Sequence, residues 1–161
     1  MLIVGIDPGI ARTGWAVIET QGSKIKAKEH GCFETDKSTP LTTRLLEVHT
    51  FIQNLLKKHK PDALAIEDLF FSNNAKTAFV VGQARGVILL ASGQNKIPVA
   101  IYTPLQVKLS VTGYGKAQKP QVGKMIKVIL GLDEIPKIDD TADALAIALT
   151  HAFSYKVKER I

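Results

Sequence analysis

The chain has little of what would place it in a membrane or in an oxidising compartment. Cys32 is its single cysteine, so it has no internal disulfide, as is typical of proteins in a reducing cytoplasm. No apolar run approaches the roughly 20 residues that a membrane-spanning helix needs. No basic residues precede the first apolar run, so we do not expect a signal peptide. These absences predict a cytoplasmic protein.

Internal repeats, linkers and low-complexity tracts are absent as well. The 161 residues suit one domain, which we expect at residues 1–156, with a short basic tail at 157–161. Lysine and arginine number 21 against 15 acidic residues, for a net charge of +6. This surplus favours a polyanionic partner, although a basic protein with no such partner would show the same excess.

Hydrophobic periodicity predicts an α/β chain. We expect strands at 2–7, 13–20, 25–34, 62–67 and 98–102, and helices at 40–59, 74–95, 104–111, 119–131 and 139–156. Ser38 or Thr39 is expected to cap the first helix. The short connections between the first three strands predict an antiparallel meander. The whole order implies a mixed five-stranded sheet with helices on both faces.

Four carboxylates stand at the ends of apolar elements. Asp7 follows the run 2–6, Glu67 follows 63–66, and Asp140 and Asp143 precede 144–149. Two strand ends and a helix start can converge at one edge of a sheet, where an acid cluster suits a hard cation. Two like charges about 4 Å apart cost roughly 4 kcal/mol at an effective dielectric near 20. Such a cluster therefore requires protons or divalent metal, which predicts metal-assisted chemistry on an anionic substrate.

Each acid also has an ordinary structural interpretation. Asp7 before a Pro-Gly pair can be a turn residue, and Asp140 can cap a helix or interact with its dipole. Asp139 precedes Asp143 by one helical turn, as Asp140 does, and competes with it for the same role. The presence of all four acids favours the metal site. Mg²⁺ is favoured over zinc because no cysteine or histidine stands at ligand spacing, and His151 is interpreted as structural.

Four sequence blocks are distinctive in combination. They are Gly5-Ile6-Asp7-Pro8-Gly9 followed by Thr13-Gly14-Trp15, then Ala65-Ile66-Glu67, Gly82-Gln83-Ala84-Arg85-Gly86, and Asp140-Thr141-Ala142-Asp143-Ala144-Leu145. Through these blocks the chain resembles, from residue 2 to about 154, the RuvC family of Holliday junction resolvases. The resemblance implies the ribonuclease H-like fold, a homodimer, and Mg²⁺-dependent cutting of four-way DNA junctions.

The same resemblance assigns the site residues. It implies that Asp7, Glu67, Asp140 and Asp143 are the catalytic, metal-binding acids, favours Asp140 over Asp139, and leaves Asp68 without a ligand role. We expect two Mg²⁺ ions per site, replaceable by Mn²⁺, with Asp7 as the bridging ligand. Hydrolysis would then leave 5′-phosphate and 3′-hydroxyl ends. The branch-migration complex RuvA–RuvB is an implied partner.

DNA-binding residues are also implied. Phe70 matches a family aromatic that contacts bases at the junction, and Lys108 and Lys119 match lysines that contact DNA. Lys116 lies in the same basic stretch, which by itself would more simply be a solvated face. Lys76 and Arg85 could add phosphate contacts. Small residues along the helix 74–95, at Ala75, Ala78, Gly82 and Gly86, indicate either close packing on the sheet or a two-fold interface.

The sequence is compatible with two other functions. The strand followed by Asp7-Pro8-Gly9 also begins the phosphate loop of actin-like phosphotransferases, but that class needs two such domains, and no Walker-type glycine loop is present. A noncatalytic nucleic-acid scaffold is the second alternative. The complete set of acids argues against it.

Overall fold

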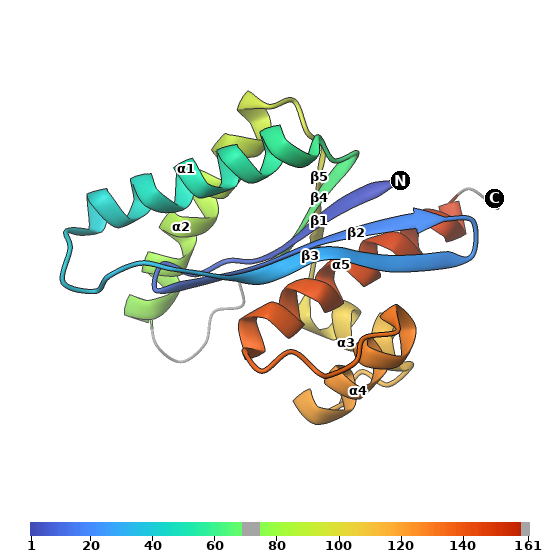
Figure 1. The fold of residues 1–161 in the computed structure, drawn as a ribbon. Helices are drawn as coiled ribbons and strands as arrows, with labels where there is room; N and C mark the ends of the chain where they lie inside the picture. Colours follow the sequence, from blue (N-terminus) through green and yellow to red (C-terminus); the bar gives the residue numbers. More distant parts are fainter. Residues whose placement is uncertain (69–74, 159–161) are drawn as a thin grey trace.

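The structure is a computed structural model that describes residues 1–68 and 75–158 (Figure 1). The strands are β1 (Leu2–Asp7), β2 (Arg12–Gln21), β3 (Lys24–Glu34), β4 (Ala63–Glu67) and β5 (Val99–Tyr102). The helices are α1 (Leu41–His59), α2 (Ala75–Gln94), α3 (Pro104–Thr112), α4 (Lys119–Leu130) and α5 (Asp139–Lys158). Each expected strand and helix is present, with boundaries that differ by a few residues.

The five strands form one mixed sheet in the order β3-β2-β1-β4-β5. β1, β2 and β3 are antiparallel neighbours, as the meander prediction required, whereas β4 pairs parallel to β1 and β5 parallel to β4. Asp7, the last residue of β1, lies opposite Gly14 of β2 in this ladder. The carboxyl ends of β1 and β4 therefore meet at the same edge of the sheet.

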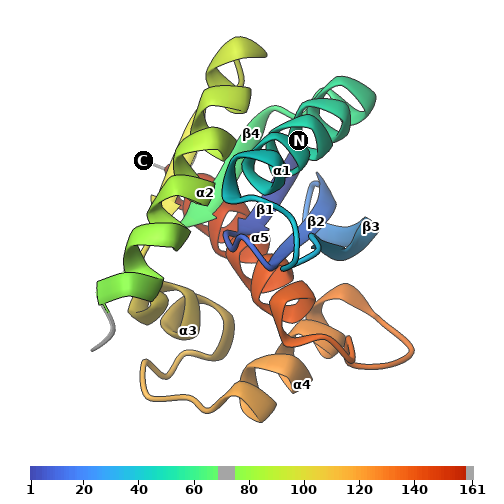
Figure 2. The ribbon, with the colours of Figure 1, turned by 90° about the vertical axis from the view of Figure 1, so that its left-hand side faces the viewer.

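Helices cover both faces of the sheet, as expected (Figure 2). α1 and α2 lie on one face, where Ile52 and Ile88 are fully buried with Val4 and Ile66. α5 crosses the other face, with α3 and α4 beyond it, and Leu145 and Ile126 are buried there with Ile3. The two cores follow from the alternation of side chains along each strand.

Two local expectations were wrong. α1 has Pro40 at its N-cap position and no side-chain cap, so neither Ser38 nor Thr39 caps it. The Thr39 hydroxyl instead donates to the backbone carbonyl of Asp36, and the Asp36 carboxylate accepts the Ser38 N–H, because these residues form a turn of their own. α5 continues to Lys158, two residues into the expected tail.

Some expectations lie outside the described residues, among them the loop that carries Phe70 and the chain end at 159–161. Within the described residues, no helix is both long and apolar enough to cross a membrane.

Candidate active site

The alternation of side chains brings two of the predicted acids to one face of the sheet. Along β1, Ile3 belongs to the core beneath α5, and Val4 and Ile6 belong to the opposite core. Asp7 is therefore on the α5 face, with the same parity as Ile3. In β4, Ala65 packs beneath α5, so Glu67 emerges on that face as well.

Glycines allow α5 to approach this face closely. A Cβ atom at Gly14 would lie 1.9 Å from the Asp140 carbonyl oxygen, and one at Gly5 would lie 2.3 Å from the Ala144 carbonyl oxygen. Such separations are far below any van der Waals contact, so only glycine fits at these two positions. The first turn of α5 thus contacts the backbone of β2 at Gly14, which is the residue paired with Asp7 in the sheet.

The charges of the acids interact strongly as a result. Burial, together with the negative charges of Asp143, Glu67 and Asp140, raises the pKa of Asp7 to about 8. Burial and Asp143 raise the pKa of Glu67 to about 7, against the opposing effect of Lys119 and Lys108. The pKa of Asp143 is also raised, chiefly by burial. The four acids predicted from the sequence therefore form one electrostatic cluster.

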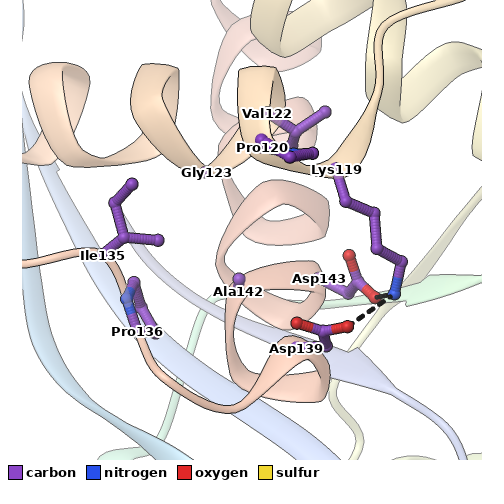
Figure 3. Close-up of a pocket in the computed structure, with 9 residues that line it drawn as sticks. All are labelled: Lys119, Pro120, Val122, Gly123, Ile135, Pro136, Asp139, Ala142 and Asp143. Carbon is purple, nitrogen blue, oxygen red and sulfur yellow. Dashed lines mark hydrogen bonds and ion pairs between the residues drawn. The ribbon is translucent and has the colours of Figure 1, made fainter.

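Lys119, at the start of α4, supplies one cation to this cluster. Its Nζ atom lies 3.1 Å from Asp143 Oδ2 and 3.5 Å from Asp139 Oδ2 (Figure 3). Partial burial acts to lower the pKa of Lys119, but the hydrogen bonds and charges of the two aspartates outweigh it and raise that pKa. These three residues border a cavity of about 310 Å³ between α4, α5 and the segment that holds Ile135.

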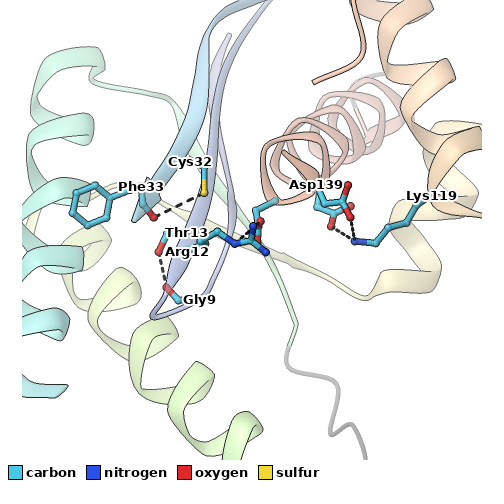
Figure 4. A network of polar contacts seen from close by, with 9 residues as sticks. Gly9, Arg12, Thr13, Cys32, Phe33, Lys119 and Asp139 are labelled. Carbon is cyan, nitrogen blue, oxygen red and sulfur yellow. Dashed lines mark hydrogen bonds and ion pairs between the residues drawn. The ribbon is translucent and has the colours of Figure 1, made fainter. Parts of the chain in front are cut away.

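Arg12, at the start of β2, supplies another cation. Its Nε atom lies 3.2 Å from Asp140 Oδ2, and the arginine points toward the start of α5 (Figure 4). That carboxylate oxygen is buried and accepts no hydrogen bond from any residue that the structure describes. The contact with Arg12 is thus an ion pair without a hydrogen bond. A buried carboxylate oxygen that accepts no hydrogen bond is uncommon in folded proteins.

These observations test whether the acids suit a divalent metal. As they lie, no three acidic, histidine or cysteine side chains in residues 1–68 and 75–158 converge closely enough to hold one. Asp143 is turned to Lys119 and Asp140 to Arg12. The donor set nevertheless fits a hard cation. It is all carboxylate, it includes the orphaned Oδ2 of Asp140, and burial together with mutual repulsion raises the pKa values of Asp7, Glu67 and Asp143.

The other predicted residues lie at varied distances from the cluster. Lys108 of α3 is near enough for its charge to lower the pKa of Glu67. Lys116 is exposed in the segment between α3 and α4. Arg85 of α2 lies 3.7 Å from Asp68 and is mostly buried, which favours a structural role. Lys76 lies in the first turn of α2, and Phe70 lies outside the described residues.

Two features of the site were not predicted from the sequence. The first is the ion pair of Arg12, whose face of the sheet becomes evident only once β2 is aligned with β1. The second is the close approach of α5 at Gly5 and Gly14. A glycine inside a strand often marks such an approach, so these two residues were a usable signal. His151, interpreted as structural, shares a 2.8 Å hydrogen bond with the Tyr102 hydroxyl.

A mixed five-stranded sheet in the order β3-β2-β1-β4-β5, with helices on both faces, defines a protein of the ribonuclease H-like class. The family model described as crossover junction endodeoxyribonuclease RuvC matches residues 3–151. The chain belongs to this family, and it is accordingly an endodeoxyribonuclease of crossover junctions that depends on a divalent metal ion.

Individual relatives cover nearly the whole chain. The protein of Desulforamulus reducens is 52% identical over 152 residues, covering 94% of this chain and 93% of its own length. That of Desulfitobacterium hafniense is 50% identical over 161 residues, covering 100% and 98%. Both are described as crossover junction endodeoxyribonuclease RuvC.

Solved structures agree with this assignment. Thermus thermophilus RuvC in complex with a Holliday junction substrate is 37% identical, with a TM-score of 0.94 over 98% of this chain and 96% of that one. A fowlpox virus resolvase with junction DNA has a TM-score of 0.60 at 15% identity, covering 94% of this chain and 99% of its own. At that identity it shows the shared fold alone.

Proposed function

We propose that this protein resolves Holliday junctions by paired, symmetric hydrolysis of two phosphodiesters, with Asp7, Glu67, Asp140 and Asp143 as the metal ligands. The electrostatic coupling of these four carboxylates is the observation that carries the proposal. The junction as substrate rests on family membership and on the substrate in the Thermus thermophilus complex.

The carboxylates would hold two Mg²⁺ ions, and Mn²⁺ is expected to substitute. When bound, the two metals would activate a water and stabilise the leaving 3′ oxygen, which leaves 5′-phosphate and 3′-hydroxyl ends. Asp7 is proposed as the shared ligand, because the charges of Glu67, Asp140 and Asp143 all act on it. Asp139 is not proposed as a ligand, since its side chain is 72% exposed.

The DNA would approach along α3 and the start of α4. Lys108 and Lys119 both act electrostatically on Glu67, so phosphates that they bind would lie beside the acids. Lys116 lies on the segment between those two helices and would extend the same basic surface. For Phe70 we keep the role implied by the resemblance, which is stacking on a base near the cut, worth about 1–3 kcal/mol.

Two copies of the chain would make the symmetric cuts. α2 supports this idea, because Phe79 and Leu90 are 71% and 54% exposed, and a Cβ atom at Gly86 would meet nothing within 4 Å. These three residues follow one helical face, opposite the buried Ala84, Ile88 and Ala91. An exposed apolar face with a glycine at its centre suits an isologous helix pair. In this proposal Gly86 would face the partner chain rather than the sheet.

Action in the cytoplasm and cooperation with RuvA–RuvB are further parts of the proposal. The location rests on the relatives that process junction DNA, and the cooperation with RuvA–RuvB rests on the resemblance to the RuvC family. A pull-down of RuvA–RuvB on junction DNA, with and without this protein, would measure the cooperation.

Substitution of Asp7 by asparagine tests the proposed site. Asp7→Asn should abolish junction cleavage and leave junction binding nearly unchanged, because it removes charge from the metal site without removing a DNA contact. Cleavage of a labelled junction and of a matched linear duplex should be measured with Mg²⁺ and with a chelator. Cleavage by Asp7→Asn at the wild-type rate would exclude Asp7 as a ligand. Cleavage of duplex as fast as junction would contradict the proposed substrate.

A further inference from the structure

Arg12 occupies a fixed place beside the acid cluster. It is the first residue of β2, and it is separated from Gly14 and Ala16 by two and four residues. Because alternate side chains of a strand share a face, its side chain emerges on the α5 face with Asp7. The turn before it is tightly held: the buried Thr13 hydroxyl donates to the Gly9 carbonyl at 2.6 Å (Figure 4). The backbone that carries Arg12 is therefore held in place beside the start of α5.

The ion pair that Arg12 makes is incomplete. The side chain is 56% exposed and that of Asp140 is 22% exposed, so the pair lies at the rim of the site. Its Nε atom is 3.2 Å from Asp140 Oδ2 without donating a hydrogen bond. A pair of this kind is weak, because the guanidinium is half exposed to solvent and no hydrogen bond directs it.

Two of the acids are each turned toward a basic side chain. Arg12 holds Asp140 and Lys119 holds Asp143, and no three acids converge on one point within the described residues. A divalent cation bound to Asp140 Oδ2 would repel the Arg12 guanidinium, whose Nε atom lies 3.2 Å from that oxygen, and would favour its departure. The displaced guanidinium would stay at the rim, half exposed and beside the scissile phosphate, which the metals would also contact.

We propose that Arg12 is an internal counter-ion for Asp140 that bound metal displaces onto a DNA phosphate. Metal binding then frees Arg12 to bind a DNA phosphate. Phosphate binding in turn draws Arg12 away from Asp140, where it competes with the metal. The two ligands consequently strengthen each other by the same factor, as thermodynamic linkage requires. Arginine suits both positions, since its planar fork pairs with a carboxylate and with a phosphate. This inference rests on the proposed function, because it takes Asp140 as a metal ligand.

The first experiment measures metal binding without DNA. Titration calorimetry with Mn²⁺ should show Arg12→Gln binding metal about two- to fivefold more tightly than the wild type, as loss of a half-exposed ion pair implies. Arg12→Lys should stay near the wild type. Arg44→Gln is the matched control: Arg44 donates to the Thr35 hydroxyl instead of the acid cluster, so the same change of charge there should leave the affinity unchanged. Asp140→Asn should weaken metal binding.

The second experiment measures junction binding with non-cleavable linkages at the exchange point. With saturating Mg²⁺, Arg12→Gln should bind more weakly than the wild type and show a salt slope reduced by about 0.9 for each lost contact. With a chelator, the two proteins should bind alike, because Arg12 is then engaged by Asp140.

The outcomes separate this inference from the proposed function. Unchanged Mn²⁺ affinity in Arg12→Gln, together with weakened affinity in Asp140→Asn, would overturn the role of Arg12 and leave the ligand set intact. Unchanged affinity in Asp140→Asn would overturn both. An equal loss of junction binding with and without metal would show that Arg12 is an ordinary phosphate contact, which also overturns the exchange.

Discussion

Gly14 of β2 lies directly beneath the first turn of α5, where a Cβ atom would come 1.9 Å from the Asp140 carbonyl oxygen. Because Gly14 is also the ladder partner of Asp7, this one contact joins the strand and the helix that carry the acids. The absence of a side chain at residue 14 thus determines how closely Asp140 can approach Asp7.

Substitution at this contact should damage both fold and site. Gly14→Ala is expected to destabilise the protein by about 1–3 kcal/mol or more, since backbone atoms of α5 would have to shift. Urea denaturation would measure the loss. Gly93→Ala on α2 is the control, because a Cβ atom there meets nothing within 4 Å and alanine favours a helix. Equal stability of the Gly14→Ala and Gly93→Ala variants would contradict the close approach.

The raised pKa values predict how stability varies with pH. Asp7 titrates at about 8 in the folded protein, against an ordinary value of 3.8. Between these values the folded state holds a proton that the unfolded state has released, so the metal-free protein should lose stability as pH rises through about 8. Glu67, at about 7, acts in the same direction.

Calorimetric melting in a chelating buffer, from about pH 5 to about pH 9, would measure this decline. Asp7→Asn should flatten the curve, because asparagine cannot titrate. Mg²⁺ should lessen the decline, because metal neutralises the cluster that protons otherwise neutralise. Stability that rose over this range in the chelator would contradict the pKa shifts.

The two adjacent aspartates of α5 should respond differently to substitution. The Asp139 side chain is 72% exposed and lies 3.5 Å from Lys119, so Asp139→Asn should keep most cleavage activity. Asp140 acts on Asp7 and carries a buried oxygen without a hydrogen bond, so Asp140→Asn should lose nearly all of it. Single-turnover cleavage of a labelled junction would compare them. The reverse order of activities would show that the helix acids had been assigned in the wrong register.

Junction binding should weaken steeply with salt. Each neutralised phosphate contributes about −0.9 to the slope of log K against log salt on duplex DNA. Replacing Lys108 and Lys119 together by alanine should therefore flatten the slope by several units across two subunits. Binding titrations at increasing salt would measure it, with Lys24 and Lys26, exposed on the edge strand β3, replaced together as the charge-matched control. Identical slopes in both double variants would show that Lys108 and Lys119 are solvated and do not contact DNA phosphates.

The sequence by itself was enough to predict the elements and the sheet and to single out four acids, whose role as metal ligands stays a prediction. Strand alternation and helical periodicity are local patterns, and an acid at the end of an apolar run is visible without knowing its neighbours. The incorrect prediction of the α1 cap shows the limit of local reasoning. Ser38 and Thr39 are suitable cap residues, but in the structure both form hydrogen bonds with Asp36 in the preceding turn.

Only the tertiary structure decided what the acids contact. Arg12 lies far from Asp140 along the chain, as Lys119 does from Asp143, and these ion pairs exist because β2, α4 and α5 meet at one edge of the sheet. The pKa values of Asp7 and Glu67 are likewise set by burial and by charges from other elements. Electrostatic energy depends on distance through space and on exclusion of water, and neither is a property of residue order.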